Sequence, residues 1–444
     1  MDALKDKGSL AIVEREVSPE LDVSSILLGL REQPILFESV SGSSLKLAGN
    51  LYSTRELVEL GLGVENGRLP DVLQDAIRNP SQSKGRISSF KKTDWDSSEP
   101  ADLMKLPILK HFDREAGRYM TAGIVATRFP GSDRENLSFH RLLVLSKNKV
   151  AARIVPRHLD EIAKEKKGKV EVCVVVGPPP PVFVAASMQT QYGVSEYSIA
   201  NKLARRNLDL SESETGEVCF PLDSEIVLEG VLDYEDQTDE GPFVDLTGTY
   251  DEVRRQPVIT FHRMHYRKNS VYQAIVASSS EHAIFMGLPQ ELKILDVLSK
   301  SIPKIRGINL TPASGGYFHC VASIEKSNDG DGKTAILDCF AASHPLKYVV
   351  VVDSDVDPFD LNQVEWALTT RFQADRGVLI VNGAKGSSLD PSSGKLAVTS
   401  KIGLDATLPM KEDRGKYSKA TITSSQVAKS VLAAMKEAGR KGQN

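Results

Sequence analysis

The chain has 444 residues, a length that favours two or three domains over a single core. Apolar residues make up 41% and charged residues 26%, and the net charge of −4 gives no broad attraction to nucleic acid or to an anionic membrane. The sequence has no apolar run long enough for a bilayer, no apolar core of signal-peptide length in MDALKDKGSL and no closely spaced cysteine pair. We therefore expect a cytoplasmic protein without nucleic-acid partners, membrane spans or disulfides.

The first hundred residues mix helix and strand patterns. Residues 18–30 and a stretch from Ser53 have apolar residues at helical spacing, and residues 34–40 have the composition of a strand. Residues 79–100 are polar and predict a loop.

Residues 118–260 are mostly strand-like, with alternating or continuous β-branched runs. Strands at this spacing predict a barrel or a strongly bent sheet. Two helical stretches interrupt them, at 157–169 and on both sides of Gly193 within 178–206.

After about residue 290, predicted strands and helices alternate, which predicts a second α/β domain. Residues 351–360 (VVDSDVDPFD) contain four aspartates but fail the EF-hand pattern, so we expect an acidic turn that caps a helix. Residues 424–441 predict an amphipathic helix that must dock on its own body or on a partner subunit.

The segment EGPFVDLTGTY (240–250) carries two candidate catalytic acids. Glu240 and Asp245 lie five residues apart around a Gly-Pro turn, which can fold both carboxylates toward one point. Buried carboxylates need a positive partner or a shared proton. Spacing alone favours the alternative, a turn with solvated acids.

Residues 136–159 predict a hairpin with its turn at 146–149. Antiparallel pairing would bring Asn136 near His158, and with a carboxylate from elsewhere these groups can hold a divalent ion such as manganese. Arginines beside the pair can bind a phosphate bidentately. Without a third ligand the segment is better explained as a basic hairpin face, and Glu196 as a charge at a helix N-terminus.

Taken together, the chain resembles the UbiD family of prenylated-FMN-dependent decarboxylases. Several motifs occur in family order over nearly the whole length: NLYSTRE, LPILKHF, NLSFHRL, ARIVPRHL, EGPFVDLTGTY, MGLPQE, VVVVDSDVD, WALTTRFQADR and KIGLDAT. The resemblance implies an α/β (α+β) fold with a split β-barrel flavin-binding domain. It further implies an N-terminal α/β segment (1–105), the barrel (106–295), an α/β oligomerisation domain (296–420) and a C-terminal helix on a partner subunit (421–444).

The resemblance also assigns site residues. Asn136, His158 and Glu196 would ligate manganese, with potassium as a further candidate ion nearby. Arg141, Glu240 and Asp245 would form the acid–base trio. Residues expected to contact the cofactor are Phe139, His140, Arg141, Arg153, Ile154, Val155, Arg157 and His158.

The activity that the resemblance implies is a carboxy-lyase reaction. It would be the reversible, non-oxidative decarboxylation of an aromatic, heteroaromatic or α,β-unsaturated acid through a covalent substrate–prenylated-FMN adduct, with Asp245 as proton donor. Many members have Glu where Asp245 stands, so the reach of the acid is shorter here. The expected partners are a small carboxylic acid, a flavin prenyltransferase that supplies the cofactor, and further copies of the chain in a homodimer or homohexamer. Two alternatives stay open: a split-barrel FMN oxidoreductase, and a non-catalytic subunit of a decarboxylase complex.

Overall fold

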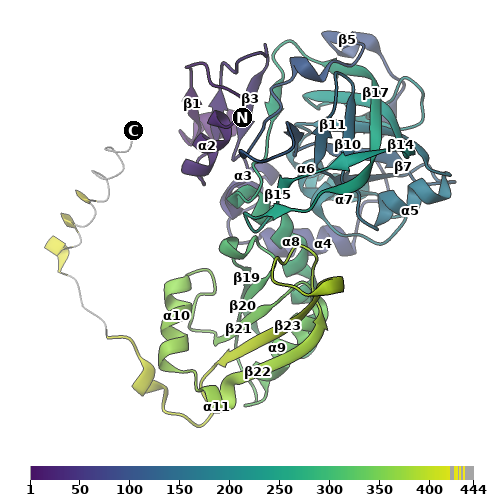
Figure 1. The fold of residues 1–444 in the computed structure, drawn as a ribbon. Helices are drawn as coiled ribbons and strands as arrows, with labels where there is room; N and C mark the ends of the chain where they lie inside the picture. The colour runs from purple at the N-terminus through teal and green to yellow at the C-terminus, as the bar shows by residue number, and fades with distance from the viewer. Residues whose placement is uncertain (1, 421–424, 429, 432–433, 436–444) are drawn as a thin grey trace.

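The computed structural model describes residues 2–420, 425–428, 430–431 and 434–435. Its elements form two bodies joined by the long helix α8 (Ser280–Leu298), as Figure 1 shows. The predicted α/β fold is confirmed. Among the helices of these residues, none has both the length and the apolar character needed to cross a membrane.

The N-terminal part of the chain forms a small sheet with flanking helices. The sheet has the order β1-β2-β3-β18, so residues 271–273 return to pair with the start of the chain. The helix predicted from Ser53 begins after Thr54, whose hydroxyl accepts a hydrogen bond from the Leu57 backbone N–H at 3.3 Å. The elements are α1 (Asp2–Asp6), β1 (Ala11–Val13), α2 (Asp22–Gly29), β2 (Ile35–Phe37), β3 (Lys46–Gly49), α3 (Arg55–Leu62), α4 (Leu69–Arg78) and β18 (Val271–Gln273).

A nine-stranded antiparallel sheet forms the centre of the larger body. Its order is β6-β9-β10-β17-β14-β11-β7-β8, with β5 paired to β17. The strands are β5 (Ser97–Glu99), β6 (Tyr119–Met120), β7 (Ile124–Arg128), β8 (Glu135–Phe139), β9 (Leu142–Val144), β10 (Lys149–Ala152), β11 (Lys169–Val176), β14 (Ile226–Glu240) and β17 (Arg254–Tyr266).

Both faces of this sheet are buried, which explains the continuous apolar run in β11. Val172 and Val174 pack into a cluster that includes α2 and α5 (His158–Glu165), while Cys173 and Val175 pack toward α6 (Pro180–Ser187) and α7 (Glu196–Ala204). The four cysteines are buried and free, as expected. Short strands complete this body: β4 (Arg86–Ser88), β12 (Asp209–Glu212), β13 (Cys219–Pro221), β15 (Phe243–Val244) and β16 (Tyr250–Asp251).

The hairpin predicted for residues 136–159 is only partly correct. Strands β9 and β10 do pair around the predicted turn, with Leu142 opposite Ala152. The strand does not continue back to Asn136, because β8 pairs with β7 at the far end of the sheet. The break falls at His140 and Arg141, where the chain leaves one strand and enters another. Asn136 and His158 are therefore not cross-strand neighbours, and the prediction that hairpin pairing brings them together was wrong.

The second body is a five-stranded sheet with helices on both faces. Its order is β19-β20-β21-β23-β22. Helices α8 and α9 cover one face and α10 covers the other, because alternate valines of β21 belong to opposite clusters. The elements are β19 (Ile305–Leu310), β20 (His319–Ile324), α9 (Asp331–Ala342), β21 (Tyr348–Asp353), α10 (Leu361–Thr370), α11 (Ala374–Gly377), β22 (Val378–Lys385) and β23 (Val398–Ala406).

Two expectations for the C-terminal part have different outcomes. The acidic turn at 351–360 does cap a helix, since the Asp360 side chain accepts hydrogen bonds from the N–H groups of Asn362 and Gln363 at the start of α10. The final helix predicted at 424–441 falls largely outside the described residues. Those of its residues that are described, such as 426–428, have helical backbone.

Candidate active site

The hairpin β15–β16 places two acids at the end of strand β14. β14 ends at Glu240, and the hairpin pairs Phe243 with Asp251. Asp245 begins the connecting turn, where its backbone N–H donates to the carbonyl of Thr249 at 3.0 Å. The hairpin therefore presents one acid in its turn, Asp245, and a further acid on its second strand, Asp251.

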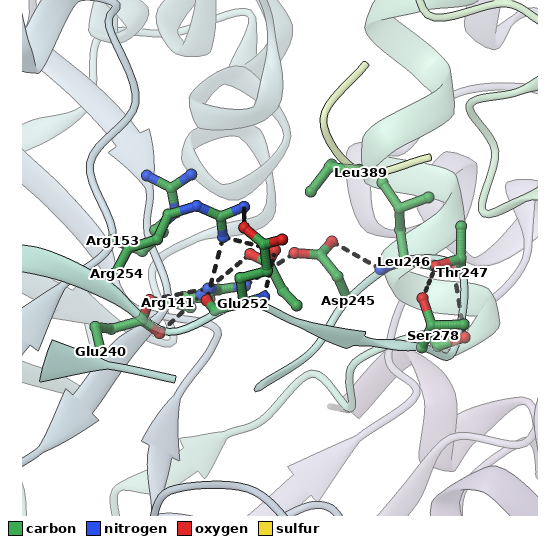
Figure 2. A network of polar contacts seen from close by, with 12 residues as sticks. Arg141, Arg153, Glu240, Asp245, Leu246, Thr247, Glu252, Arg254, Ser278 and Leu389 are labelled. Atoms are coloured by element: carbon green, nitrogen blue, oxygen red, sulfur yellow. Dashed lines mark hydrogen bonds and ion pairs between the residues drawn. The ribbon is translucent and has the colours of Figure 1, made fainter. Parts of the chain in front are cut away.

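Arg141 is the centre toward which these acids point (Figure 2). Its Nε and Nη2 donate to the two oxygens of Glu240, both at 2.9 Å, and its Nη1 donates to Asp245 Oδ2 at 2.9 Å. Nη2 also donates to Asp251 Oδ2 at 3.0 Å. The predicted trio of Arg141, Glu240 and Asp245 is thus brought together, and a third carboxylate joins it.

Burial distinguishes the three carboxylates. The side chains of Glu240 and Asp251 are 0% and 6% exposed, whereas that of Asp245 is 18% exposed. Arg141 is 9% exposed, and its guanidinium lies 4.8 Å from the ring centroid of Phe243. Phe243 therefore holds the face of the guanidinium, and the carboxylates hold its edge. Because Asp245 is the most exposed of the three acids, it is the one that a ligand can reach.

Two more arginines surround this ion cluster. Arg254 Nη1 lies 2.6 Å from Asp251 Oδ1. Burial raises the pKa of Asp251, but the hydrogen bond from Arg254 and the charges of Arg141 and Arg254 outweigh it, so the pKa of Asp251 is lowered. Arg153 has no carboxylate partner among the described residues, and burial together with the charges of Arg254 and Arg141 lowers its pKa. Figure 2 shows Arg153 and Arg254 on the same side of Arg141.

His282, in the first turn of α8, also faces Asp245. Its Nδ1 accepts a hydrogen bond from the Ser278 backbone N–H at 3.1 Å, so the neutral ring carries its proton on Nε2. Burial lowers the pKa of His282, although the neighbouring Asp245 carboxylate acts to raise it. The neutral imidazole can donate from Nε2 near the acid.

Asn136 and Glu196 form a second, buried polar centre. Leu137 N–H donates to Glu196 Oε2 at 2.7 Å, and Asn136 Nδ2 lies 3.4 Å from the same oxygen. Burial raises the pKa of Glu196 to about 7, although the Leu137 N–H acts to lower it. Asn136 Oδ1 is buried and has no hydrogen-bond partner among the residues that the structure describes. An unsatisfied amide oxygen beside a carboxylate fits a cation.

The third predicted metal ligand, His158, lies at the start of α5. Its ring centroid is 5.5 Å from that of Tyr192 and 6.3 Å from that of Phe129. No hydrogen bond joins it to Asn136 or Glu196 among the described residues, and burial lowers its pKa, which favours the neutral imidazole that binds metals. In the part of the chain that the structure describes, no three His, Cys, Asp or Glu side chains cluster as a metal site; the predicted set has only two such side chains.

The residues expected to contact the cofactor lie on either side of the break in the sheet. His140 Nδ1 donates to the Arg153 carbonyl at 3.0 Å, and burial lowers the pKa of His140 to about 4, so the ring is neutral. Phe139 packs against Phe183 with ring centroids 4.9 Å apart. Ile154 is buried, whereas Val155 and Arg157 are exposed. Residues 153–157 form the loop that joins β10 to α5.

Sequence reasoning missed Asp251, Arg254 and His282. A signal for Asp251 was available: a hairpin turning at Thr247-Gly248 sets residue 251 opposite Phe243, on the second strand. His282 gave no comparable signal, because its role depends on how α8 packs against the turn at Asp245.

Comparisons with known proteins find similar chains along most of this sequence. Three family models match the chain: the 3-octaprenyl-4-hydroxybenzoate carboxy-lyase N-terminal domain at residues 1–77, its Rift-related domain at 83–280 and its C-terminal domain at 283–406. The chain is 38% identical over 405 residues to the anhydromevalonate phosphate decarboxylase of Methanothermobacter thermautotrophicus, covering 90% of this chain and 94% of that protein.

Solved structures are similar along the same length. The UbiD-class enzyme HmfF from Pelotomaculum thermopropionicum in complex with FMN has a TM-score of 0.91 and 33% identity, covering 94% of this chain and 95% of that chain. An evolved dimeric form of HmfF in complex with prFMN has a TM-score of 0.85 and 31% identity, with the same coverage.

Proposed function

Since this chain belongs to the UbiD family of carboxy-lyases, we propose that it decarboxylates an α,β-unsaturated acid that carries a phosphate, as anhydromevalonate phosphate does. The relative that covers nine-tenths of the chain is named for that substrate. The proposed substrate is narrower than the class of aromatic, heteroaromatic and α,β-unsaturated acids that the family resemblance implies.

The observation that carries the proposal is the unfinished hydrogen bonding of Arg141. A guanidinium has five N–H donors, and within the part of the chain that the structure describes four of them are engaged, by Glu240, Asp245 and Asp251. The remaining donor is on Nη1, beside the partly exposed Asp245. A substrate carboxylate bound there would lie next to the acid that must return a proton after CO₂ leaves.

Charge balance supports Asp245 as the proton donor. The three carboxylates of the cluster are matched by three arginines, which are Arg141 itself, Arg153 and Arg254. A bound substrate carboxylate therefore adds an uncompensated negative charge unless one acid takes up a proton. Glu240 is held by two Arg141 donors and Asp251 by two arginines, whereas Asp245 has one arginine contact. Asp245 is therefore the acid that a proton reaches at least cost.

Asn136 and Glu196 fit the metal that the family implies, and arginines in the neighbouring loop fit the phosphate of its cofactor. Asn136, with its unsatisfied Oδ1, Glu196 and His158 would hold manganese, and with it the phosphate of prenylated FMN. Prenylated FMN, when bound, supplies an electron sink for the carbon that loses CO₂. Arg153 and Arg157, which have no carboxylate partner among the described residues, would contact the cofactor from the loop between β10 and α5.

The test is a decarboxylation assay on protein produced together with a flavin prenyltransferase. We expect CO₂ release from anhydromevalonate phosphate and much less from cinnamate or from furan carboxylates. Protein loaded with FMN alone is the matched control and should not turn over the acid. NAD(P)H oxidation by the FMN form, without CO₂ release by the prenylated form, would support a flavin oxidoreductase instead. Inactivity of correctly loaded protein toward every acid tried would support a non-catalytic subunit.

We also propose that residues 296–420 and the final segment 421–444 mediate assembly into a homodimer or a hexamer built from dimers. Ile380 and Ile402 are cross-strand neighbours on β22 and β23, and both are exposed, at 59% and 37%. A similar enzyme has been evolved into a dimeric form. Light scattering should give a mass of two or more chains, and Ile380→Lys should lower it. A strict monomer would contradict this assembly.

A further inference from the structure

Asp251 occupies a donor of Arg141 that the catalytic trio does not need. Arg141 Nη2 is shared between Glu240 Oε2 at 2.9 Å and Asp251 Oδ2 at 3.0 Å. Asp251 is itself held in place, because its Oδ1 is 2.6 Å from Arg254 Nη1 and 2.9 Å from the Glu252 backbone N–H. It is 6% exposed and sits on β16, directly across the hairpin from Phe243, on which the guanidinium rests.

We propose that Asp251 is a positioning residue that determines how tightly Arg141 holds Asp245, and so keeps Asp245 able to carry the proton it donates. The inference rests on the proposed decarboxylase function. Asp251 touches neither substrate nor cofactor in this scheme, and it acts only through Arg141.

Asp245 and Asp251 compete electrostatically for one cation, Arg141. Arg141 attracts Asp245 less strongly when a second nearby carboxylate already compensates part of its charge. Asp251 also repels a negative charge on Asp245 directly. Arg254 moderates both effects because it neutralises part of Asp251.

The other charged and titratable groups that face Asp245 come from three elements. Glu240 ends β14, His282 lies in the first turn of α8, and Tyr317 lies in the loop before β20. None of them changes in the variants below, and bound cofactor adds the same charge to each variant. The comparison between variants therefore isolates Asp251 and Arg254.

Two substitutions should shift the pH profile in opposite directions. Because the donor must be protonated, kcat falls at high pH as Asp245 ionises. Asp251→Asn strengthens the ion pair between Arg141 and Asp245. The high-pH limb of the kcat–pH profile should therefore move down by about one pH unit, and kcat at neutral pH should fall about tenfold. KM should stay the same or fall, because the pocket becomes more positive. Arg254→Gln leaves Asp251 uncompensated, so the limb should move up.

Matched controls separate charge from packing. Glu252→Gln removes a neighbouring negative charge that is 86% exposed and lies 3.6 Å from Arg254 but does not contact Arg141, so the limb should stay in place. Asp251→Glu keeps the charge and should restore most of kcat. If Asp251→Asn does not fold, the proposal is tested by Arg254→Gln alone, in which the high-pH limb of kcat should move up. Shifts of both variants in the same direction, or no shift, would overturn the proposal.

A second readout does not depend on turnover. The carboxyl carbon of Asp245 can be titrated by NMR in protein labelled with ¹³C-aspartate and free of cofactor, with Asp245→Asn to assign the signal. Its midpoint should fall in Asp251→Asn and rise in Arg254→Gln. These shifts in a protein that decarboxylates no acid would leave the role of Asp251 intact and reject the proposed function. Active protein without these shifts would reject the role of Asp251 alone.

Discussion

Two arginine clusters with almost the same parts lie in the two bodies of this protein. In the smaller body, Arg371 Nη1 donates to Asp353 at 3.0 Å and Nη2 donates to Asp355 at 2.7 Å, with Trp366 5.0 Å below the guanidinium. In the larger body, Arg141 binds three carboxylates and lies on Phe243. Each cluster combines a buried arginine, paired acids and an aromatic face.

The clusters differ in the further hydrogen bonds that their acids accept. Asp353 also accepts hydrogen bonds from the Leu408 backbone N–H at 2.9 Å and from Arg414 at 3.3 Å, so it ties the end of β21 to the chain that follows β23. Within the described residues, Asp245 has only Arg141 as a distant partner, and its Oδ1 accepts from the N–H of the next residue, Leu246, at 2.7 Å. The Arg371 cluster therefore connects parts of the smaller body, while the Arg141 cluster leaves Asp245 accessible to a ligand.

Asp245→Asn should have the largest effect. The variant keeps the shape of the side chain but cannot donate the proton, so kcat should fall by about 10³. Flavin content and the free energy of unfolding should stay close to wild type. CO₂ release, flavin absorbance and urea denaturation measure the three quantities. Turnover within tenfold of wild type would remove Asp245 from the mechanism. The Arg141 cluster would then have no catalytic role to distinguish it from the Arg371 cluster.

Arg371→Met should show the opposite pattern. Asp353, 2% exposed, would lose its main cation, and breaking a buried pair costs about 3–5 kcal/mol of unfolding free energy. Urea denaturation measures the loss, and kcat per folded, cofactor-loaded molecule should be unchanged. Arg371→Lys, which keeps the charge but not the bidentate grip, should lose less. A stable Arg371→Met variant with low kcat would mean that this cluster serves catalysis.

Glu196→Gln tests the second polar centre of the larger body. The amide cannot offer a negative oxygen to a divalent ion, so manganese affinity should fall by about 10–100-fold. Metal content after dialysis and manganese electron paramagnetic resonance measure this. Glu135→Gln is the matched control, because Glu135 is equally buried but pairs with Arg128 at 3.4 Å. Undiminished manganese binding by Glu196→Gln would reject its role as a ligand.

Asp355→Asn should have the smallest effect. The Asp355 side chain is 57% exposed, so its pair with Arg371 should contribute only about 0.5 kcal/mol to the unfolding free energy. The hydrogen bond from Arg371 lowers the pKa of Asp355 below its ordinary value. The difference from wild type should therefore be present at neutral pH and vanish as pH falls through that lowered value. A difference that grows at acid pH would contradict the assignment.

The two acidic segments show how far sequence reasoning reached. For VVDSDVDPFD the spacing predicted a turn that caps a helix, and Asp360 does cap α10. For EGPFVDLTGTY the spacing by itself favoured solvated acids, yet Glu240 is fully buried. The first outcome depends on neighbouring backbone N–H groups, which local sequence specifies. The second depends on a cation from elsewhere in the chain, and only family resemblance pointed to it.

By itself the sequence predicted most of the strands and helices, because these follow from side-chain periodicity within short windows. It did not predict the break between β8 and β9, or the short strands β4 and β5 within the loop expected at 79–100. It also determined where the family motifs lie. Tertiary structure decided which acids share Arg141, since Asp251 is 110 residues away along the chain and reaches Nη2 only through the β15–β16 hairpin. Electrostatic roles depend on distance in space and on burial, and neither is a property of spacing along the chain.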